Sequence, residues 1–245
     1  MKITQLVILF NYKKIVLGIL ISLFLFILSF QINSSLWIIL LRSLGCLIIL
    51  NILASITASY ILYDKSDLYE LNNLQEFVDW EKIENVVVIH ASFDPLSAKM
   101  EKRYPHINFT VCDIYGNRHE DESGIEVSKK MFPPNPKEIR ISPDILPFEN
   151  ESQDIILAVT ALHEILDHQK RVLFFKESKR ILKKGGLIII SEQFRDVTNF
   201  IFFNIGAFHF LSQKQWKESI SPAEMEIIEN MKLTPFANML ILKKN

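Results

Sequence analysis

The sequence predicts an α/β domain with a mostly parallel sheet, preceded by a hairpin of two membrane-spanning helices. Two short apolar runs, Ile155–Val159 and Leu187–Ile190, flank one long amphipathic segment. This is the pattern of two parallel strands joined by a crossover helix. The first quarter of the chain is instead strongly apolar. We therefore expect a transmembrane hairpin at residues 1–63, a linker helix at 64–84 and the α/β domain at 85–245.

The composition limits the possible partners. The chain has 245 residues and a formal net charge of −1, without the clustered basic face that nucleic-acid binding needs. Its two cysteines, Cys46 and Cys112, are far apart and match neither a disulfide framework nor a zinc motif. We therefore expect neither a nucleic-acid partner nor a bound metal.

The hairpin is predicted from two apolar runs. Ile15–Phe30 is uninterrupted and Leu44–Tyr63 is nearly so, and each supplies roughly the 20 residues that cross a bilayer. A signal peptide is the alternative for the first run, but a second run follows it and no clear small-residue cleavage site does. Arg42 is either placed toward the outer interface by its long side chain or held by a lipid headgroup.

The charges around the hairpin predict its orientation. Lys2, Lys13 and Lys14 precede the first span, whereas the link at residues 31–35 carries no charge. The positive-inside rule then places the N-terminus in the cytoplasm. Because two crossings return the chain to the same side, we expect an inner (cytoplasmic) membrane protein with a cytoplasmic soluble domain.

The soluble part begins with a strand–helix–strand pattern. Asn85–His90 has the composition of a buried strand, Pro95–Tyr104 that of a helix, and Ile107–Cys112 that of a second strand ending at Asp113. An acid at this point, roughly 20 residues after the first strand, is typical of nucleotide-binding α/β folds, where it binds ribose hydroxyls.

The remaining elements complete a sheet. Residues 115–137 predict an irregular helix and a loop. The expected elements after them are a short strand at Ile139–Ser142, a short helix at Ser212–Ser219 and a final strand pair at Glu224–Leu233 and Ala237–Lys243. Between them, Asn199–Phe210 carries five phenylalanines in twelve residues.

Three motifs resemble the class I S-adenosylmethionine-dependent methyltransferases, specifically the type 11-like branch. Leu146–Phe148 followed by Asp154–Ile156 is similar to the family's lead into its fourth strand, and Ala161–His163 continues that likeness. Arg180–Gly186 before Leu187–Ile190 is similar to the family's turn into its fifth strand. The resemblance runs from about residue 85 to 243. It implies a Rossmann-like sheet of seven strands, the last antiparallel, and S-adenosylmethionine as the cofactor.

The first motif departs from the family. In the family, the first strand leads through an acid into a glycine-rich turn under the cofactor. Here Val88 stands at the acid's place, His90, Ser92 and Asp94 stand at the glycine places, and residues 64–115 contain no glycine. Because glycine permits positive φ and close approach of backbone to ligand, these side chains should narrow the pocket or remodel the turn.

The resemblance implies a set of cofactor-binding residues. Asp113 is placed to bind the ribose, with Ile114 beside it; otherwise it caps the next segment. Ser92 and Asp94 either contact the amino-acid end of the cofactor or, for Asp94, cap the following helix. The full predicted set is His90, Ala91, Ser92, Asp94, Asp113, Ile114, Asp144, Ile145, Leu146, Thr160 and Ala161. Within it, Asp144 to Leu146 would contact the adenine unless they form only a turn.

Acid–base candidates are few. His163 and Glu164 are the catalytic candidates, since an imidazole titrates near neutrality; the alternative is a histidine packed at a helix start. Glu192 and His209 point roughly toward the same crevice and are otherwise structural. The phenylalanine-rich stretch either lines an acceptor pocket, forms a core helix or enters the bilayer. Methyl transfer needs little general catalysis when the acceptor is already nucleophilic.

The sequence thus predicts a membrane-anchored methyltransferase, a transferase acting on a small or lipid-like acceptor. The altered first turn supports an alternative, a catalytically inactive methyltransferase-fold protein that serves as a membrane-tethered binding or scaffold module. A different nucleotide-using enzyme is disfavoured because the chain has neither a GxGxxG nor a phosphate-loop lysine motif.

Overall fold

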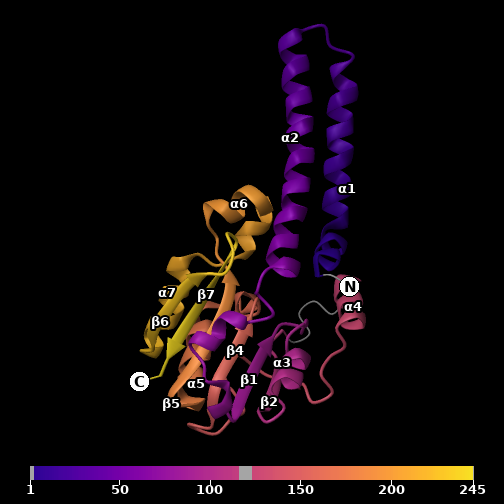
Figure 1. The fold of residues 1–245 in the computed structure, drawn as a ribbon. Helices are drawn as coiled ribbons and strands as arrows, with labels where there is room; N and C mark the ends of the chain where they lie inside the picture. The colour runs from indigo at the N-terminus through magenta and orange to yellow at the C-terminus, as the bar shows by residue number, and fades with distance from the viewer. Residues whose placement is uncertain (1–2, 116–122, 245) are drawn as a thin grey trace. The chain divides into compact units, whose positions relative to one another are not determined.

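The computed structural model describes residues 3–115 and 123–244, which form two compact units, residues 1–65 and 66–245. The first unit consists of α1 (Ile3–Ser29), α2 (Ser35–Ser59) and a π-helical turn, Tyr60–Lys65 (Figure 1). Both helices are long and apolar enough to cross a membrane. Side chains such as Leu20, Phe24 and Ile27 are more than half exposed, unlike those of a soluble core helix.

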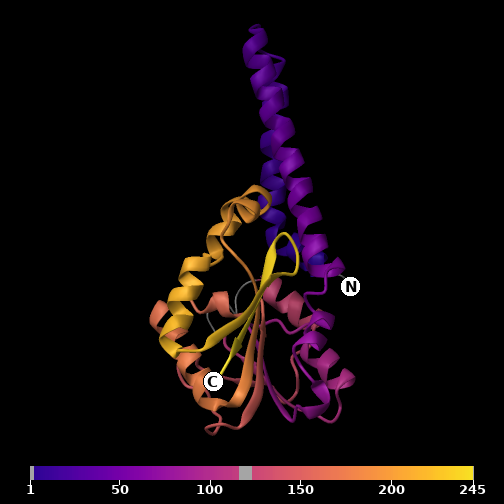
Figure 2. The ribbon, with the colours of Figure 1, turned by 60° about the vertical axis from the view of Figure 1, so that its left-hand side comes forward.

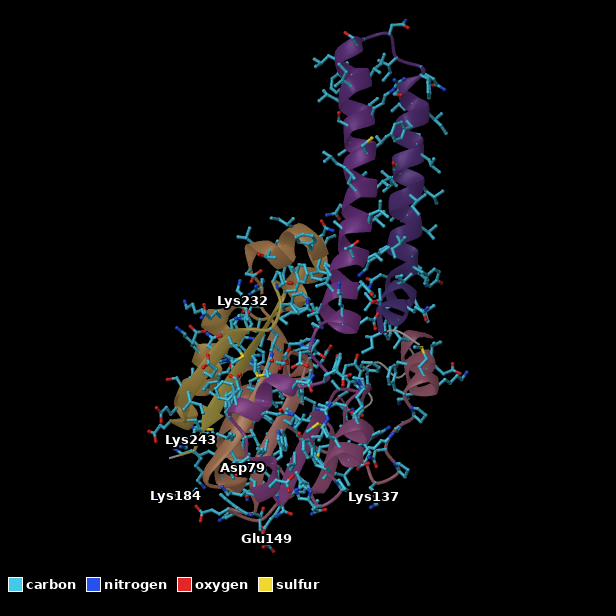
Figure 3. All side chains as sticks on the ribbon, in the orientation of Figure 1. Asp79, Lys137, Glu149, Lys184, Lys232 and Lys243 are labelled. Atoms are coloured by element: carbon cyan, nitrogen blue, oxygen red, sulfur yellow. The ribbon has the colours of Figure 1, made fainter. Side chains whose placement is uncertain are left out.

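The two helices of the first unit pack closely against each other. Ser22 donates a hydrogen bond to the carbonyl of Gly45 (2.9 Å), and a Cβ at Gly45 would lie 2.9 Å from the Phe26 ring. Arg42 donates from Nε to Ser29 Oγ (3.1 Å) and lies over the Phe30 ring, at the end of the hairpin where the helices are linked. Carbon atoms predominate among the side chains of these two helices (Figure 3).

The second unit is a seven-stranded sheet with helices on both sides (Figure 2). The strand order is β3-β2-β1-β4-β5-β7-β6. The strands are β1 (Asn85–His90), β2 (Asn108–Asp113), β3 (Ile139–Arg140), β4 (Gln153–Val159), β5 (Leu182–Gln193), β6 (Glu226–Lys232) and β7 (Ala237–Lys243). β1 to β5 are mutually parallel, and β7 runs antiparallel to β5 and β6. The predicted last antiparallel strand is thereby confirmed.

Helices connect these strands. They are α3 (Ser97–Arg103), α4 (Ser123–Met131), α5 (His168–Ile181), α6 (Val197–Phe203) and α7 (Gln213–Ile220). Phe174 and Phe175 of α5 and Trp216 of α7 are buried in one core cluster with alternate residues of the central strands. This alternation follows from the period of two along a strand.

The linker helix predicted at 64–84 is wrong. In residues 66–84, all of which the structure describes, the helical turns are the 3-10 helices Asn72–Glu76 and Trp80–Lys82. Asp67 accepts hydrogen bonds from the side chain of Asn72 and the amide of Asn73 (3.0 Å), and Leu71 has a left-handed φ of 53°. Such side-chain bonds compete with helical ones. Segment 66–84 therefore belongs to the second unit.

The double glycine lies inside a strand rather than before one. The resemblance implied a turn at Arg180–Gly186 before a strand at Leu187–Ile190, but α5 ends at Ile181 and β5 begins at Leu182. Gly185 has a φ of 77°, and a Cβ on Gly186 would lie 2.9 Å from the carbonyl oxygens of Asp154 and Lys183. Both positions therefore require glycine for the irregular start of β5.

Candidate active site

The predicted site residues gather where the strand order reverses. β1 and β4 are neighbours, and the chain leaves them toward opposite sides of the sheet. In open α/β sheets, ligands bind at the carboxyl ends of strands beside this reversal. The ends of β1, β2 and β4 bring together His90 to Ser92, Asp113 and Thr160 to His163.

His90 turns toward a carboxylate within the protein. It is buried at the end of β1, and its Nε2 lies 3.1 Å from Oε2 of Glu138, just before β3. Burial by itself lowers the pKa of His90, but the carboxylates of Glu138, Asp94 and Asp113 outweigh it and raise that pKa. The hydrogen bond from His90 lowers the pKa of Glu138. The first position that carries glycine in the family thus holds a buried histidine beside a partly exposed carboxylate.

Ser92 keeps the backbone shape that glycine would give. Its φ is 62°, in the left-handed region that side chains rarely adopt. Its amide donates to Oδ1 of Asp113 (3.0 Å), which also accepts from the amide of Tyr115 (2.9 Å). The buried carboxylate of Asp113 therefore joins the turn after β1 to the end of β2.

Asp94 caps the start of the next helix. Its Oδ1 accepts from the amides of Leu96 (3.0 Å) and Ser97 (2.8 Å), and its Oδ2 accepts from the Ser97 hydroxyl. This is the capping alternative that the sequence left open. Next to it, the ring of Phe93 packs edge-on against Phe132, with ring centroids 4.9 Å apart.

The segment expected beside the adenine is divided between solvent and core. Ile145 is 70% exposed, whereas Leu146 is buried in the core cluster, so the two do not form one apolar surface. Asp144 accepts a hydrogen bond from Ser142, which lowers the pKa of its carboxyl group. Of the three residues Asp144, Ile145 and Leu146, the first is partly exposed, the second is exposed and the third is buried.

Arg180 explains why two of the sequence motifs occur together. It lies near the end of α5 and donates to the carbonyls of Leu146 (2.9 Å) and Phe148 (2.8 Å). Its partner Glu177 (2.7 Å) accepts in turn from the amide of Leu146 (3.1 Å). The segment before β4 is thus bound to the helix that follows β4.

Thr160 is bound by a residue that the sequence did not indicate. It follows β4 with a left-handed φ of 50°, and its hydroxyl lies 2.9 Å from that of Tyr69. Tyr69 is buried, which raises the pKa of its phenol, as do the nearby carboxylates of Glu192 and Asp94. Segment 66–84 therefore reaches the end of β4. Ala161, the next residue, is fully buried.

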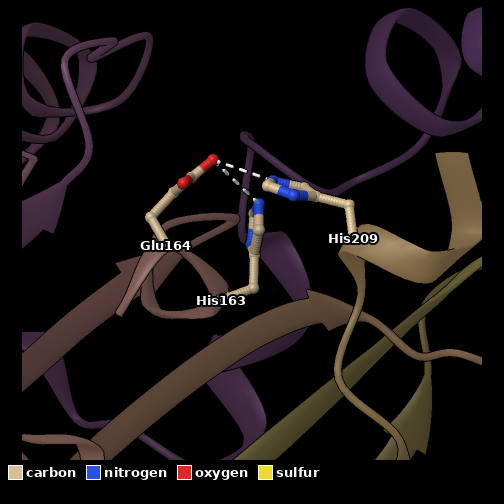
Figure 4. A group of neighbouring side chains, drawn as sticks. All are labelled: His163, Glu164 and His209. Carbon is tan, nitrogen blue, oxygen red and sulfur yellow. Dashed lines mark hydrogen bonds and ion pairs between the residues drawn. The ribbon is translucent and has the colours of Figure 1, made fainter. Parts of the chain in front are cut away.

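The catalytic candidates form one cluster with Glu192 and His209. Glu192 is buried at the end of β5; its Oε1 accepts from the amides of Ala161 (3.1 Å), Leu162 (2.8 Å) and His163 (3.4 Å). Its Oε2 lies 2.7 Å from Nδ1 of His163. Glu164 Oε1 lies 3.0 Å from His209 Nε2 and 3.6 Å from His163 Nε2 (Figure 4). The expectation that these side chains share one crevice agrees with this geometry.

The aromatic stretch 199–210 forms α6 and a 3-10 helix, Asn204–His209. Asn199 is buried and donates to the carbonyls of Phe194 (2.8 Å) and Phe236 (3.0 Å), which anchors the stretch to β5 and β7. Ile205 and Phe208 are 81% and 62% exposed. The stretch is therefore apolar on an exposed face as well as on its packed one.

Comparison with known proteins agrees with this architecture. Residues 112–190 match a family model described as a methyltransferase domain. A methyltransferase structure from Methanosarcina mazei superimposes with a TM-score of 0.52 at 14% identity, covering 71% of this chain and 97% of that one. A structure from Pyrococcus horikoshii OT3 gives 0.53 at 13% identity, covering 76% and 98%. The second unit has the class I methyltransferase fold. Among curated protein sequences, none matches this chain.

The backbone at the ends of β1 and β2 is compatible with the cofactor turn that the resemblance implies. The turn after β1 is left-handed at Ser92, an acid ends β2, and the side chains of His90 and Asp94 are directed to partners within the protein. The residues present fit an adenosyl cofactor at the ends of β1 and β2.

Several residues of this candidate site were not predicted from the sequence. Glu138 and Glu177 belong to no motif. Glu138 pairs with His90, 48 residues away, and Glu177 contacts Leu146, 31 residues away, and Arg180, one helical turn along. Tyr69 stands in a segment whose helical pattern was misleading. Glu192 was named, but its four partners at residues 161–163 follow only from the register of β4 and β5.

Proposed function

We propose that this protein is a membrane-anchored S-adenosylmethionine-dependent methyltransferase that acts on a small or lipid-like acceptor. The observation that carries the proposal is the turn after β1. Ser92 holds the left-handed conformation and donates its amide to Asp113, within a class I methyltransferase fold. A left-handed backbone conformation is unfavourable for a residue with a side chain, so it persists only where the surrounding structure holds it in place.

The cofactor would lie along the ends of β1, β2 and β4. Asp113 would accept from the ribose hydroxyls through lone pairs not used by Ser92 and Tyr115, since each carboxylate oxygen can accept two hydrogen bonds. Asp144 and Ile145 would face the adenine. His90, Ala91 and Ser92 would line the turn beneath it, with Ile114, Thr160 and Ala161 beside it.

When bound, the cofactor would supply a methyl group on a sulfonium, from which the neutral thioether departs as a good leaving group. The chain's own contribution is alignment of the acceptor and exclusion of water. Where the acceptor carries a proton, His163 is the base. A carboxylate can only accept, so Glu192 fixes the proton of His163 on Nδ1 and leaves Nε2 as the acceptor.

A lipid-like acceptor is consistent with the proposed membrane attachment, because lipid-like molecules reside in the bilayer. Phenylalanines of residues 199–210 lie next to His209, and Phe210 packs edge-on against His163, with ring centroids 6.3 Å apart. The chain also carries two helices suited to crossing a bilayer. Lys13 and Lys14 lie within α1 directly before its uninterrupted apolar run, Ile15–Phe30, and favour a cytoplasmic methyltransferase domain. Protease protection in sealed vesicles of known orientation tests this side.

A binding or scaffold protein is the second candidate function. Three groups expected to contact the cofactor have partners inside the protein. Asp94 caps α3, the Thr160 hydroxyl meets Tyr69, and Asp113 accepts two backbone amides. If these contacts close the site, the fold serves only as a tethered module.

Cofactor binding separates the two functions. The full chain in detergent micelles is titrated with S-adenosylhomocysteine by calorimetry. We expect binding, and a loss of affinity of roughly 10- to 150-fold in Asp113→Asn, which corresponds to one hydrogen bond to a charged group. Asp79→Asn is the control, because the Asp79 side chain is 55% exposed and forms a surface ion pair with Lys82 (Figure 3). Absence of binding at millimolar ligand would overturn the methyltransferase proposal.

A further inference from the structure

We propose that His163, Glu164 and His209 bind a divalent transition-metal ion of the zinc class, with Glu192 supporting His163 from behind. The cluster contains two imidazole nitrogens and one carboxylate oxygen, and one such atom from each residue lies within 4.8 Å of the others. Imidazole donors favour zinc and its neighbours over magnesium and calcium, which prefer oxygen. The proposal revises the expectation from the sequence that no metal binds.

The distances are close to those of a coordination shell. Ligand atoms about 2.1 Å from a tetrahedral ion are separated by about 3.4 Å from one another. Glu164 Oε1 lies 3.0 Å from His209 Nε2 and 3.6 Å from His163 Nε2. The three side chains converge in Figure 4. Side-chain rotations of a few tenths of an ångström would therefore place all three around one ion.

Glu192 holds the His163 ring in an orientation suited to metal binding. A metal-binding imidazole commonly donates its other N–H to a carboxylate, which fixes the ring and its tautomer. Glu192 Oε2 lies 2.7 Å from His163 Nδ1, while its Oε1 is held by three backbone amides. His163 therefore has Nε2 directed at Glu164 before any ion arrives.

Charge and access also favour a cation. Two carboxylates, the buried Glu192 and the mostly buried Glu164, flank the His163 ring. A divalent ion would neutralise them without protonating the histidines. The His209 side chain is 49% exposed, so the ion and a small additional ligand can enter from solvent. Three protein ligands leave the fourth position open, as in catalytic zinc sites.

The metal would also connect two separate segments. His163 and Glu164 lie on the 3-10 turn after β4, Leu162–Glu164, whereas His209 ends the 3-10 helix Asn204–His209. Because the ion would take Nε2 of His163, it would replace the proposed role of that atom as a base. Metal binding at this cluster does not depend on methyl transfer, so the two proposals can fail separately.

The test measures metal binding directly. The full chain in detergent is stripped with a chelator, and Zn²⁺ is then titrated against a chromophoric chelator; Co²⁺ is used separately for visible spectra. We expect one ion per chain and a Co²⁺ spectrum without thiolate charge-transfer bands, since the exposed Cys46 is not a ligand. His209→Ala should weaken Zn²⁺ binding more than about 100-fold, and Glu192→Gln by about 10- to 100-fold.

The controls keep the proposal falsifiable. His106→Gln changes an exposed histidine outside the cluster, which contacts the Trp80 carbonyl and the Tyr104 ring, and this variant should bind Zn²⁺ as the unmodified protein does. Circular dichroism checks that His209→Ala, a half-exposed change, keeps the fold. The proposal is overturned if the stripped protein takes up no Zn²⁺ at micromolar concentrations, or if His209→Ala and His106→Gln bind it equally well.

Discussion

Replacing Ser92 with glycine tests whether the turn after β1 stores backbone strain. Ser92 has a φ of 62°, and a left-handed conformation costs a residue with a side chain about 1–2 kcal/mol. Glycine removes that cost but gives the unfolded chain more freedom, which opposes folding by about 0.4–1 kcal/mol. The amide bond to Asp113 is kept. We therefore expect Ser92→Gly to be more stable by between about zero and about 1.5 kcal/mol.

Urea unfolding of the full chain in detergent, followed by tryptophan fluorescence, measures the free energy of unfolding. Glu224→Gly is the matched control. Glu224 also has a left-handed φ, of 52°, but its side chain is 86% exposed and it lies before β6. In both substitutions glycine removes the cost of the left-handed conformation and increases the freedom of the unfolded chain. Both should therefore change the free energy of unfolding by a similar amount.

Cofactor binding then distinguishes backbone strain at Ser92 from narrowing of the cofactor site by the Ser92 side chain. If the Ser92 side chain narrows the cradle, Ser92→Gly should bind S-adenosylhomocysteine more tightly than the unmodified protein, whereas Glu224→Gly should bind it equally well. A loss of more than about 1 kcal/mol of stability in Ser92→Gly would refute the reasoning, because it would mean that the serine side chain stabilises the turn.

Three further predictions concern contacts around the same site. The pKa of His90 is raised in the folded protein and that of Glu138 is lowered, so their pair stabilises the fold most between about pH 4.5 and 6.5. The stabilisation from His90 is lost as the pH rises through its folded-state pKa. In urea unfolding, His90→Gln should therefore lower the free energy of unfolding more at pH 6 than at pH 9. Arg180→Gln should destabilise by about 1–3 kcal/mol, because two carbonyls of the segment before β4 lose a charged donor, whereas the neighbouring Lys179→Gln should stay within about 0.5 kcal/mol; equal effects would contradict the specific role of Arg180. Tyr69→Phe should cost about 1 kcal/mol, and because burial raises the pKa of this phenol, the alkaline absorbance titration up to pH 10 should be the same with and without it.

The parts of the fold that sequence predicted well are those set by local apolar patterning. The pattern of Asn85–His90 and Ala237–Lys243 identified both strands with their observed bounds, because a buried strand needs a short continuous apolar run. The pattern failed at 66–84. There, spacing of leucines at about three residues suggested a helix, but asparagine and aspartate side chains bind the backbone and break it into 3-10 turns.

The site was predictable as a location but not as a set of contacts. Strand ends placed His90, Asp113 and His163 at one edge of the sheet, since parallel strands share their carboxyl edge. The partner of His90, Glu138, lies just before β3, and the partner of His163, Glu192, lies on β5, so each pairing depends on tertiary structure that no local pattern carries. The predicted cofactor contacts themselves stay predictions until a ligand is bound.

The altered first turn is best understood as three separate physical solutions to the loss of glycine. At residue 90 the side chain is buried against a carboxylate, at residue 94 it satisfies the amides that begin α3, and at residue 92 the backbone keeps a left-handed conformation. Only the third directly affects the backbone that would face a cofactor. The ion pair and the cap hold both ends of the turn, and they supply the surroundings that such a strained residue needs. Whether this turn binds a cofactor therefore depends mainly on the space above Ser92 and on Asp113.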